Sequence, residues 1–161
     1  KIEPVGTLKR PWGQLAYTQF WATEKDPQKA PLALGILFLG GFASAMTGSK
    51  ATFLMEMAKE QKRDCVIFDY KGHGNSEGRF EEGTVGEWCE DAVAVLDHLT
   101  RGPQIIVGSS MGGWLMLLLA KARPQRVHAL VGIASSPGFT ERLFADRLSQ
   151  AERETLQSKG L

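Results

Sequence analysis

The sequence around residue 110 limits most strongly how this chain can fold. The apolar run 105–107 leads into the five-residue turn 108–112, GSSMG, and the apolar segment 114–122 follows it. The turn matches the pattern Gly-x-Ser-x-Gly, in which a serine occupies a sharp bend between a strand and a helix. The two glycines leave the space that such a bend needs. A strand that passes directly into a helix in this way indicates an α/β fold.

The rest of the chain repeats this alternation. Five segments have the pattern of strands: 15–23, 34–39, 65–70, 104–108 and 126–134. Three segments have the apolar spacing of helices: 51–61, 84–100 and 111–122. Strands and helices that alternate with short connections predict a mostly parallel sheet with helices on both faces. Ligands of such sheets bind beyond the carboxyl ends of the strands.

Polar residues mark two helix starts. Ser49 has the side chain of an N-cap, and Thr84 precedes Glu87 by the three residues of a capping box. In the first helix the spacing predicts one buried face: Phe53, Leu54, Met57 and Ala58. In the second helix it predicts another: Trp88, Ala92, Val95, Leu96 and Leu99.

Ser110 occupies the nucleophile position of the Gly-x-Ser-x-Gly pattern. The helix that starts at Met111 supplies an N–H group and a positive dipole end for an oxyanion. A second N–H donor is expected after an earlier strand, and Phe42, which follows Gly40-Gly41, fits that place. The alternative is a tight turn that holds a serine without a catalytic role. Ser109 is the competing serine, but it stands at the variable position of the pattern.

None of the three histidines is placed as a general base. His73 lies in the glycine-rich turn 72–76, where we expect it and Ser76 to hold the loop by hydrogen bonds. His98 falls late in a predicted helix, and His128 falls early in a predicted strand. Neither position is at the carboxyl edge of the sheet.

Three segments carry a resemblance to known proteins: 38–51, FLGGFASAMTGSKA; 68–76, FDYKGHGNS; and 102–114, GPQIIVGSSMGGW. They resemble the α/β-hydrolase family, and within it the group of mitochondrial palmitoyl-protein thioesterases and acyl-glucuronide esterases with their bacterial relatives. The resemblance extends over about residues 35–161. It implies the α/β-hydrolase fold and a Ser-Asp-His triad that attacks esters or thioesters.

In this resemblance Ser110 matches the nucleophile, and Phe42 and Met111 match the residues whose backbone N–H groups bind the oxyanion. We expect no cofactor and no metal. The implied substrate is a small acyl ester or an acylated protein. The implied location is mitochondrial in a eukaryote and cytoplasmic in a bacterium.

The acid and the histidine of the triad are missing from the sequence. In this fold they follow the nucleophile, after later strands. Only the predicted strand 126–134 follows Ser110, no histidine follows His128, and Glu141 and Asp146 have the setting of cap-helix residues. We therefore expect a fragment, a truncated isoform or an incomplete part of a longer protein, cut after the strand that follows the nucleophile helix.

Residues 1–134 would be the N-terminal part of the hydrolase core. Residues 135–161 would begin a helical cap, with short helices at 139–148 and 151–159.

Charge and composition exclude several classes of partner. Nineteen basic and 18 acidic residues give a net charge of +1, so nothing favours binding to nucleic acid. No apolar run reaches the roughly 18 residues of a membrane span, so we expect no stable membrane insertion. Cys65 and Cys89 are expected to be free thiols.

Two functions remain open. The first is a serine hydrolase that acts through an acyl-enzyme on Ser110. The second is a non-catalytic binding protein, or an inactive truncated isoform, that keeps the turn but lacks the base. An epoxide or haloalkane hydrolase would need a carboxylate nucleophile, and Ser110 argues against it.

Overall fold

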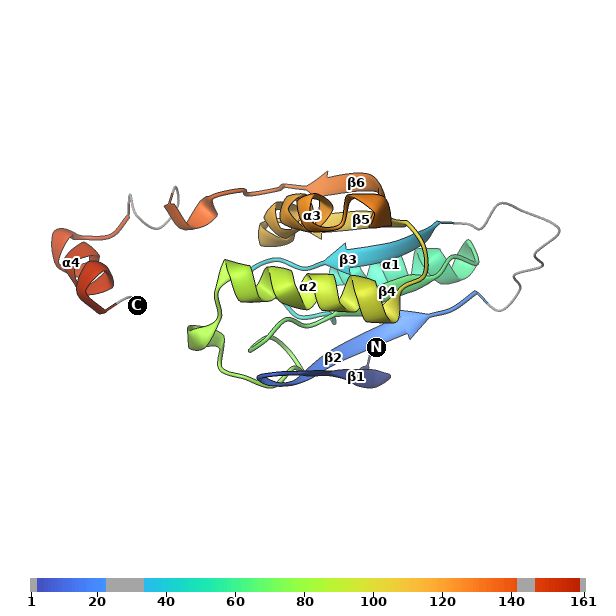
Figure 1. The fold of residues 1–161 in the computed structure, drawn as a ribbon, viewed down its shortest axis with the longest axis horizontal. Coiled ribbons are helices and arrows are strands. Elements are labelled where there is room, and N and C mark those ends of the chain that lie inside the picture. The colour runs from blue at the N-terminus through green and yellow to red at the C-terminus, as the bar shows by residue number, and fades with distance from the viewer. Residues whose placement is uncertain (1–2, 23–33, 142–146, 160–161) are drawn as a thin grey trace.

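The computed structural model describes residues 3–22, 34–141 and 147–159, and its described strands form one sheet (Figure 1). The strands are β1 (Gly6–Arg10), β2 (Gly13–Phe20), β3 (Gly35–Leu39), β4 (Cys65–Phe68), β5 (Gln104–Ser109) and β6 (Val127–Ile133). They lie in the order β1-β2-β4-β3-β5-β6. β4, β3, β5 and β6 run parallel, whereas β1 and β2 are antiparallel. The predicted mostly parallel sheet is confirmed.

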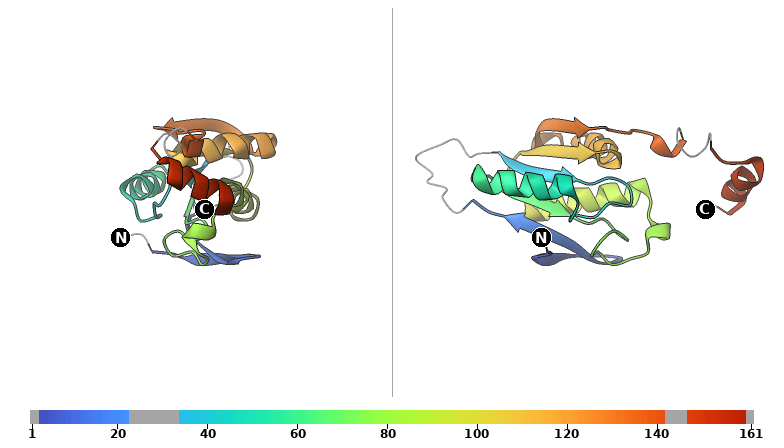
Figure 2. Two further views of the ribbon diagram at one scale, coloured as in Figure 1. Left: turned by 90° about the vertical axis from the view of Figure 1, so that its left-hand side faces the viewer. Right: turned by 180° about the vertical axis from the view of Figure 1, so that it is seen from behind.

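The described α-helices are α1 (Ser49–Glu60), α2 (Val85–Leu99), α3 (Met111–Ala122) and α4 (Gln150–Lys159). The first three cover the two faces of the sheet. Figure 2 shows α1 on one face and α2 and α3 on the other. α4 lies apart from the sheet, beyond the end at which the parallel strands finish (Figure 1).

β3 explains why the central strands are apolar throughout. Its residues alternate between two cores: Leu37 and Leu39 pack in the core of α2 and α3, and Ile36 and Phe38 pack in the core of α1. A strand between two helical layers has no face toward water, so every side chain is buried.

The first strand was not predicted. β1 pairs with β2 in a hairpin, from Gly6 opposite Tyr17 to Arg10 opposite Gly13. Its side chains alternate between exposed and half-buried, and its five residues include no long apolar run. Such a short edge strand has little sequence signal, because the pairing with β2 rather than burial defines it. β2 also ends at Phe20 instead of continuing through residue 23.

The start of α1 differs from the prediction. Gly48 is the N-cap, Ser49 is the first helical residue, and no side chain caps the helix. The buried residues are Ala51, Met55 and Ala58, whereas Phe53 is 65% exposed. The two alanines allow α1 to approach the sheet closely, and this packing turns Phe53 outward.

The predictions for the other helices agree more closely with the structure. The capping box of Thr84 and Glu87 is present at the start of α2, and Trp88, Ala92, Val95 and Leu96 are buried as expected, with Leu99 half-buried. α3 has the predicted bounds. Of the predicted helix at 139–148, residues 142–146 lie outside the described part, and α4 agrees with the second predicted helix within one residue at its start.

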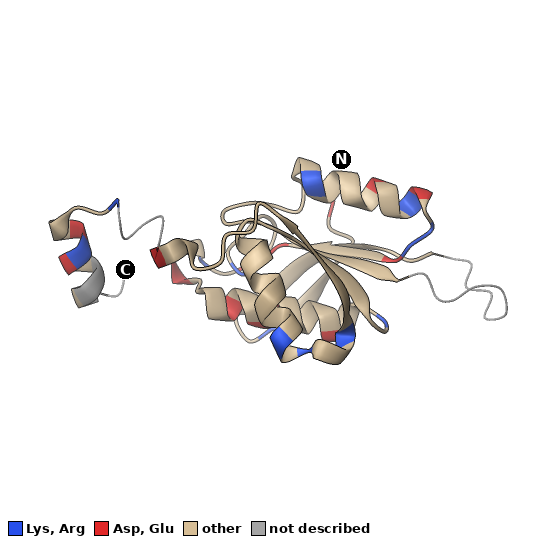
Figure 3. Cartoon of the chain, turned by 90° about the horizontal axis from the view of Figure 1, so that it is seen from above, with Lys and Arg blue, Asp and Glu red and all other residues tan. Residues whose placement is uncertain are grey.

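Acidic and basic residues are mixed along the described chain, as the nearly balanced net charge of +1 suggests. Figure 3 shows acidic and basic positions interspersed along the helices. No helix in the described ranges is long and apolar enough to cross a bilayer.

Candidate active site

Ser110 sits at the bend between β5 and α3 and is the N-cap of that helix. Its backbone has φ 54° and ψ −116°, a conformation that L-residues with a side chain rarely adopt. Hydrogen bonds hold it there: its N–H donates to the Ile133 carbonyl at 3.0 Å, and its carbonyl accepts the Ser136 N–H at 3.1 Å. The end of β6 therefore fixes the strained backbone of Ser110, whose side chain is half-buried.

Glycines let the bend pack against the end of β3. A Cβ atom at Gly112 would overlap the carbonyl oxygens of Leu39 and Gly40. A Cβ atom at Gly108 would overlap the backbone of Gly112 itself. Neither position can carry a side chain, so these contacts account for both glycines of the Gly-x-Ser-x-Gly pattern. They also bring the start of α3 against the chain that leaves β3.

The chain that leaves β3, residues 40–48, passes beside Ser110. We call this segment the oxyanion loop, after its predicted role. A Cβ atom on Gly41 would lie 3.4 Å from the Ser110 Cβ atom. Met111 is the first residue of α3, where helical N–H groups have no partner within the helix and the dipole is positive. The two predicted oxyanion donors, Phe42 and Met111, thus stand on the two segments that meet next to Ser110.

An aromatic cluster lies beside this junction. The ring of Phe42 packs against Phe80, Trp88 and Phe139, with centroids 5.0, 5.9 and 5.5 Å apart. Phe139 also contacts Trp114 at 6.0 Å and is only 6% exposed. The cluster joins the segment after β6 to the oxyanion loop and forms an apolar wall there. Sequence reasoning did not find it, because its members come from five separate segments.

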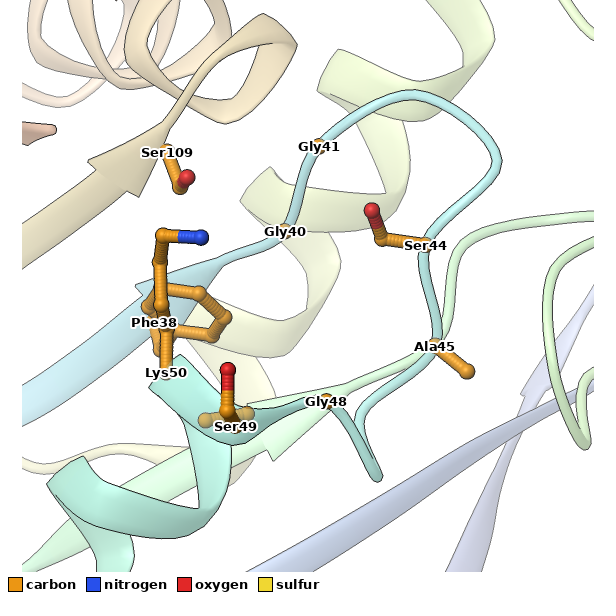
Figure 4. Close-up of a pocket in the computed structure, with 10 residues that line it drawn as sticks. Phe38, Gly40, Gly41, Ser44, Ala45, Gly48, Ser49, Lys50 and Ser109 are labelled. Atoms are coloured by element: carbon orange, nitrogen blue, oxygen red, sulfur yellow. The ribbon is translucent and has the colours of Figure 1, made fainter. Parts of the chain in front are cut away.

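One flank of the oxyanion loop is a pocket of about 130 Å³ (Figure 4). Residues from β3, the loop, α1 and β5 line it: Phe38, Gly40, Gly41, Ser44, Ala45, Gly48, Ser49, Lys50, Ala51 and Ser109. The side chains of Lys50 and Ser109 extend into the same space. Ser109 is buried and belongs to this pocket on the α1 side of the loop.

The opposite flank is the turn 69–76 that follows β4. His73 is buried, its Nδ1 lies 3.0 Å from the Lys71 carbonyl oxygen, and its Nε2 accepts the Ala43 N–H at 3.2 Å. Burial lowers the pKa of His73. Ser76 donates to the Asp69 carbonyl at 2.6 Å and accepts the Ala16 N–H at 2.8 Å. Both residues hold this turn by hydrogen bonds, as expected.

Asp69 is a residue that sequence reasoning passed over. It is 1% exposed, and its two carboxylate oxygens accept the Met46 N–H at 2.6 Å and the Asn75 N–H at 2.8 Å. Burial raises its pKa, and these two hydrogen bonds oppose that rise. The only sequence signal for Asp69 was its place near the end of a predicted buried strand, three residues before the glycine-rich turn 72–76.

The other reactive side chains lie elsewhere. His98 is exposed on α2, and His128 is exposed near the start of β6. Cys65 and Cys89 are free, as predicted, and burial raises the pKa of Cys65 to about 12 and also raises that of Cys89. Neither thiol is therefore a ready nucleophile near neutral pH. The described residues contain no cluster of acidic, histidine or cysteine side chains that could hold a metal ion.

The triad acid and base are not found beside Ser110 among the described residues. Each of the three histidines has the position given above, Glu141 is exposed beyond β6, and Asp146 lies outside the described part. What the structure brings together is a strained serine, a helix N-terminus, a glycine-containing loop and an apolar wall. This arrangement can present a hydroxyl to a carbonyl carbon and bind the oxyanion that forms, once a base activates the serine.

Comparisons with known proteins bear on the family and the fold of this chain. Residues 36–157 match the family described as alpha/beta hydrolase fold. The chain is 49% identical over 140 residues to the human mitochondrial palmitoyl-protein thioesterase ABHD10, a match that covers 87% of this chain and 44% of the human protein. The chain thus spans less than half the length of this relative. The resemblance expected from the sequence is confirmed.

Two solved structures have the same fold. Mouse alpha/beta hydrolase domain-containing protein 10 superposes with a TM-score of 0.79 at 39% identity, over 96% of this chain and 58% of the mouse chain. A protein from Agrobacterium vitis S4 superposes with a TM-score of 0.79 at 34% identity, over 96% of this chain and 60% of the bacterial chain. The expected fold class is confirmed by both.

Proposed function

The chain belongs to the alpha/beta hydrolase fold family, and from that premise we propose that it carries the nucleophile and the oxyanion hole of a serine hydrolase acting on acyl thioesters or carboxylic esters. The observation that carries the proposal is the backbone of Ser110. A φ of 54° at a non-glycine residue between a parallel strand and a helix N-terminus costs free energy, about 1–3 kcal/mol. Backbone strain of this kind clusters at active sites, where the surrounding structure holds a residue so that its side chain is presented to a substrate.

The proposed reaction has two steps. In the first, the Ser110 oxygen attacks the carbonyl carbon of the acyl group, the hydroxyl proton passes to the base, and the N–H groups of Phe42 and Met111 bind the oxyanion. The C–S or C–O bond then breaks, and the leaving thiol or alcohol takes the proton. In the second step, water attacks the acyl-Ser110 ester and releases a carboxylic acid and free Ser110. The proposal assigns neither the base nor its acid partner to a described residue.

The substrate class rests on the relatives and on the aromatic cluster. The human relative is named a palmitoyl-protein thioesterase, which favours a protein thioester carrying a long acyl chain. Phe42, which is 38% exposed, and the half-buried Phe80 offer apolar surface on the oxyanion-loop side of the site, which suits an acyl chain better than a charged group. An acyl-glucuronide ester is the second candidate substrate, from the resemblance in sequence.

The domain division and the location are also proposals. Residues 1–134 would be the N-terminal part of the hydrolase core, and residues 135–161 would begin a cap above Ser110. The packing of Phe139 on Phe42 and Trp114 supports a cap that starts there.

The names of the mammalian relatives favour a mitochondrial location if the source is eukaryotic. A bacterial source would place the protein in the cytoplasm.

A non-catalytic binding protein, or an inactive truncated isoform, is the alternative. The observation that favours it is that no histidine among the described residues lies beside Ser110. Such a protein would keep the strained turn and bind an acyl ligand along the aromatic cluster without turning it over.

Reaction with a fluorophosphonate probe distinguishes these functions. In the full-length protein we expect labelling and thioester hydrolysis that Ser110→Ala removes, with kcat falling about 10⁶-fold. Ser109→Ala is the matched control, because Ser109 is the adjacent serine and lies in the pocket on the α1 side; it should keep both activities. Labelling that survives in Ser110→Ala, or that disappears in Ser109→Ala instead, would reject Ser110 as the nucleophile.

A further inference from the structure

The oxyanion loop is exposed along three consecutive residues, although the Phe42 ring packs in the aromatic cluster and Met46 is buried. Phe42, Ala43 and Ser44 are exposed, and the loop runs between the pocket of about 130 Å³ on the α1 side and a second pocket of about 210 Å³ against the turn 69–76. Ala43 also has a φ of 53°, which an L-residue adopts only at a cost in free energy. The position of this loop decides the direction of the Phe42 N–H, so hydrogen bonds to the loop backbone bear directly on the oxyanion hole.

Two side chains of the turn 69–76 provide such bonds. The Ala43 N–H, one residue after the predicted oxyanion donor, donates to His73 Nε2 at 3.2 Å. The Met46 N–H donates to Asp69 Oδ1 at 2.6 Å, inside the protein. Both side chains come from one tight turn and act as acceptors for backbone N–H groups of the same loop. The loop is thus attached at two points to a buried support.

The contacts of His73 define its protonation. Nδ1 faces the Lys71 carbonyl oxygen, which can only accept, so Nδ1 carries the proton. Nε2 faces the Ala43 N–H, which can only donate, so Nε2 must keep its lone pair. The same Lys71 carbonyl accepts the Trp88 indole N–H at 3.1 Å, which anchors the turn to α2. Only the neutral Nδ1–H tautomer satisfies both contacts.

We propose that His73 is a positioning residue of the oxyanion hole: as a neutral imidazole it holds the Ala43 N–H, and Asp69 assists it by holding the Met46 N–H. The proposal rests on the proposed function, because it concerns the donor at Phe42. His73 does not touch the reacting atoms and takes no proton from Ser110. Its effect is on the direction of the Phe42 N–H, and therefore on the transition state more than on the bound substrate.

Substitutions at His73 test this in the full-length protein. His73→Leu removes the acceptor but keeps an apolar side chain against Phe80 and Trp88. His73→Gln places an amide oxygen near the position of Nε2 and restores an acceptor. Ser76→Ala is the matched control, because it removes hydrogen bonds of the same turn to β2 and leaves the contacts to the oxyanion loop in place.

We expect His73→Leu to lower kcat about 100-fold at unchanged KM, since a misdirected oxyanion donor acts only in the transition state. Its affinity for an acyl trifluoromethyl ketone, which forms an oxyanion on Ser110, should fall by the same factor. His73→Gln should recover most of kcat. Ser76→Ala should lower the melting temperature and leave kcat and KM near those of the wild type.

Three results would overturn the proposal: an unchanged kcat in folded His73→Leu, an equal loss in Ser76→Ala, or no recovery in His73→Gln. Because the Ser110→Ala variant tests the proposed function separately, the proposed function and the positioning role of His73 can fail independently. Turnover that survives in Ser110→Ala rejects the proposed function. Turnover lost in Ser110→Ala but intact in His73→Leu rejects only the positioning role.

Discussion

At the scale of single residues, backbone strain collects around the candidate site. Within residues 3–22, 34–141 and 147–159, four residues other than glycine have positive φ: Ala43, Lys62, Ser110 and Ala134. Three of them follow β3, β5 and β6 directly or within a few residues, at the carboxyl edge where the parallel strands end. Lys62 is the exception and follows Gln61, the C-cap of α1. Three strained residues at one edge of a sheet are typical of a site that fixes atoms for chemistry.

The protonation of His73 leads to a prediction about stability. Burial lowers its pKa below the value near 6.5 of the unfolded chain, against the opposing effects of the Lys71 carbonyl, Asp69 and Asp91. The unfolded state therefore binds more protons than the native state in the range between the two pKa values. This part of the stability is complete above about pH 6.5 and is lost as the pH falls toward the lower native value.

Thermal unfolding measured between pH 7.5 and pH 5 would check this sign, with His73→Gln as the control because glutamine does not titrate. The melting temperature of the wild type should fall more steeply on acidification than that of His73→Gln. The raised pKa of Asp91 is present in both proteins, so the comparison removes its effect, whereas the pKa of Asp69 also responds to the charge of His73 and is part of the difference measured. Parallel curves would show that the pKa of His73 is the same in the folded and the unfolded state, which would contradict the expected lowering.

At the scale of elements, the first turn of α2 joins the helix to the turn that supports the oxyanion loop. Thr84 accepts the Glu87 N–H, and the Glu87 carboxylate accepts the Thr84 N–H at 3.1 Å. The other oxygen of Glu87 accepts a hydrogen bond from Lys71 at 2.8 Å, which lowers the pKa of Glu87. One residue later, Trp88 enters the aromatic cluster. The cap of α2 therefore orients both the helix and the wall beside Ser110.

Removing this cap should have a measurable cost. We expect Thr84→Ala to lower the free energy of unfolding by about 1 kcal/mol, because a side-chain acceptor at the helix N-terminus is lost. Thr84→Ser keeps the hydroxyl and should stay near the wild type. Urea denaturation followed by tryptophan fluorescence would measure both variants. Equal stability of the alanine and serine variants would contradict a stabilising capping box.

At the scale of the whole molecule, β6 is the exposed margin of the sheet. Within the described residues it pairs with β5 on one side, and Leu130 and Val131 are 38% and 47% exposed. The cover on both faces expected for this apolar strand is not provided by the described part of the chain. An apolar edge strand with unpaired N–H and C=O groups favours association with another chain.

We therefore expect residues 1–161, expressed alone, to self-associate and to lack thioesterase turnover, because no histidine of the described ranges is placed to activate Ser110. Sedimentation velocity and a thioester hydrolysis assay would measure the two properties. Val131→Lys should reduce the association by charging the edge. Phe53→Lys is the control, since Phe53 is 65% exposed on α1, away from that edge. A monomer with turnover equal to that of the full-length protein would contradict both expectations.

The sequence alone determined the features that depend on near neighbours in the chain. The strand, turn and helix around Ser110 are encoded within about twenty residues, because apolar runs and two glycines suffice to specify them. The capping box of Thr84 and Glu87 is equally local. The buried strands were predicted because a strand between two helical layers has apolar side chains on both faces.

Tertiary structure decided the features that join distant segments. Ala43 and His73 are 30 residues apart, and neither the tautomer of His73 nor its contact with the oxyanion loop has a periodic signal in the sequence. The aromatic cluster around Phe42, the outward turn of Phe53 and the pairing of β1 likewise follow from packing. The physical reason is that such contacts depend on how the helices and loops settle on the sheet, which no single segment encodes by itself.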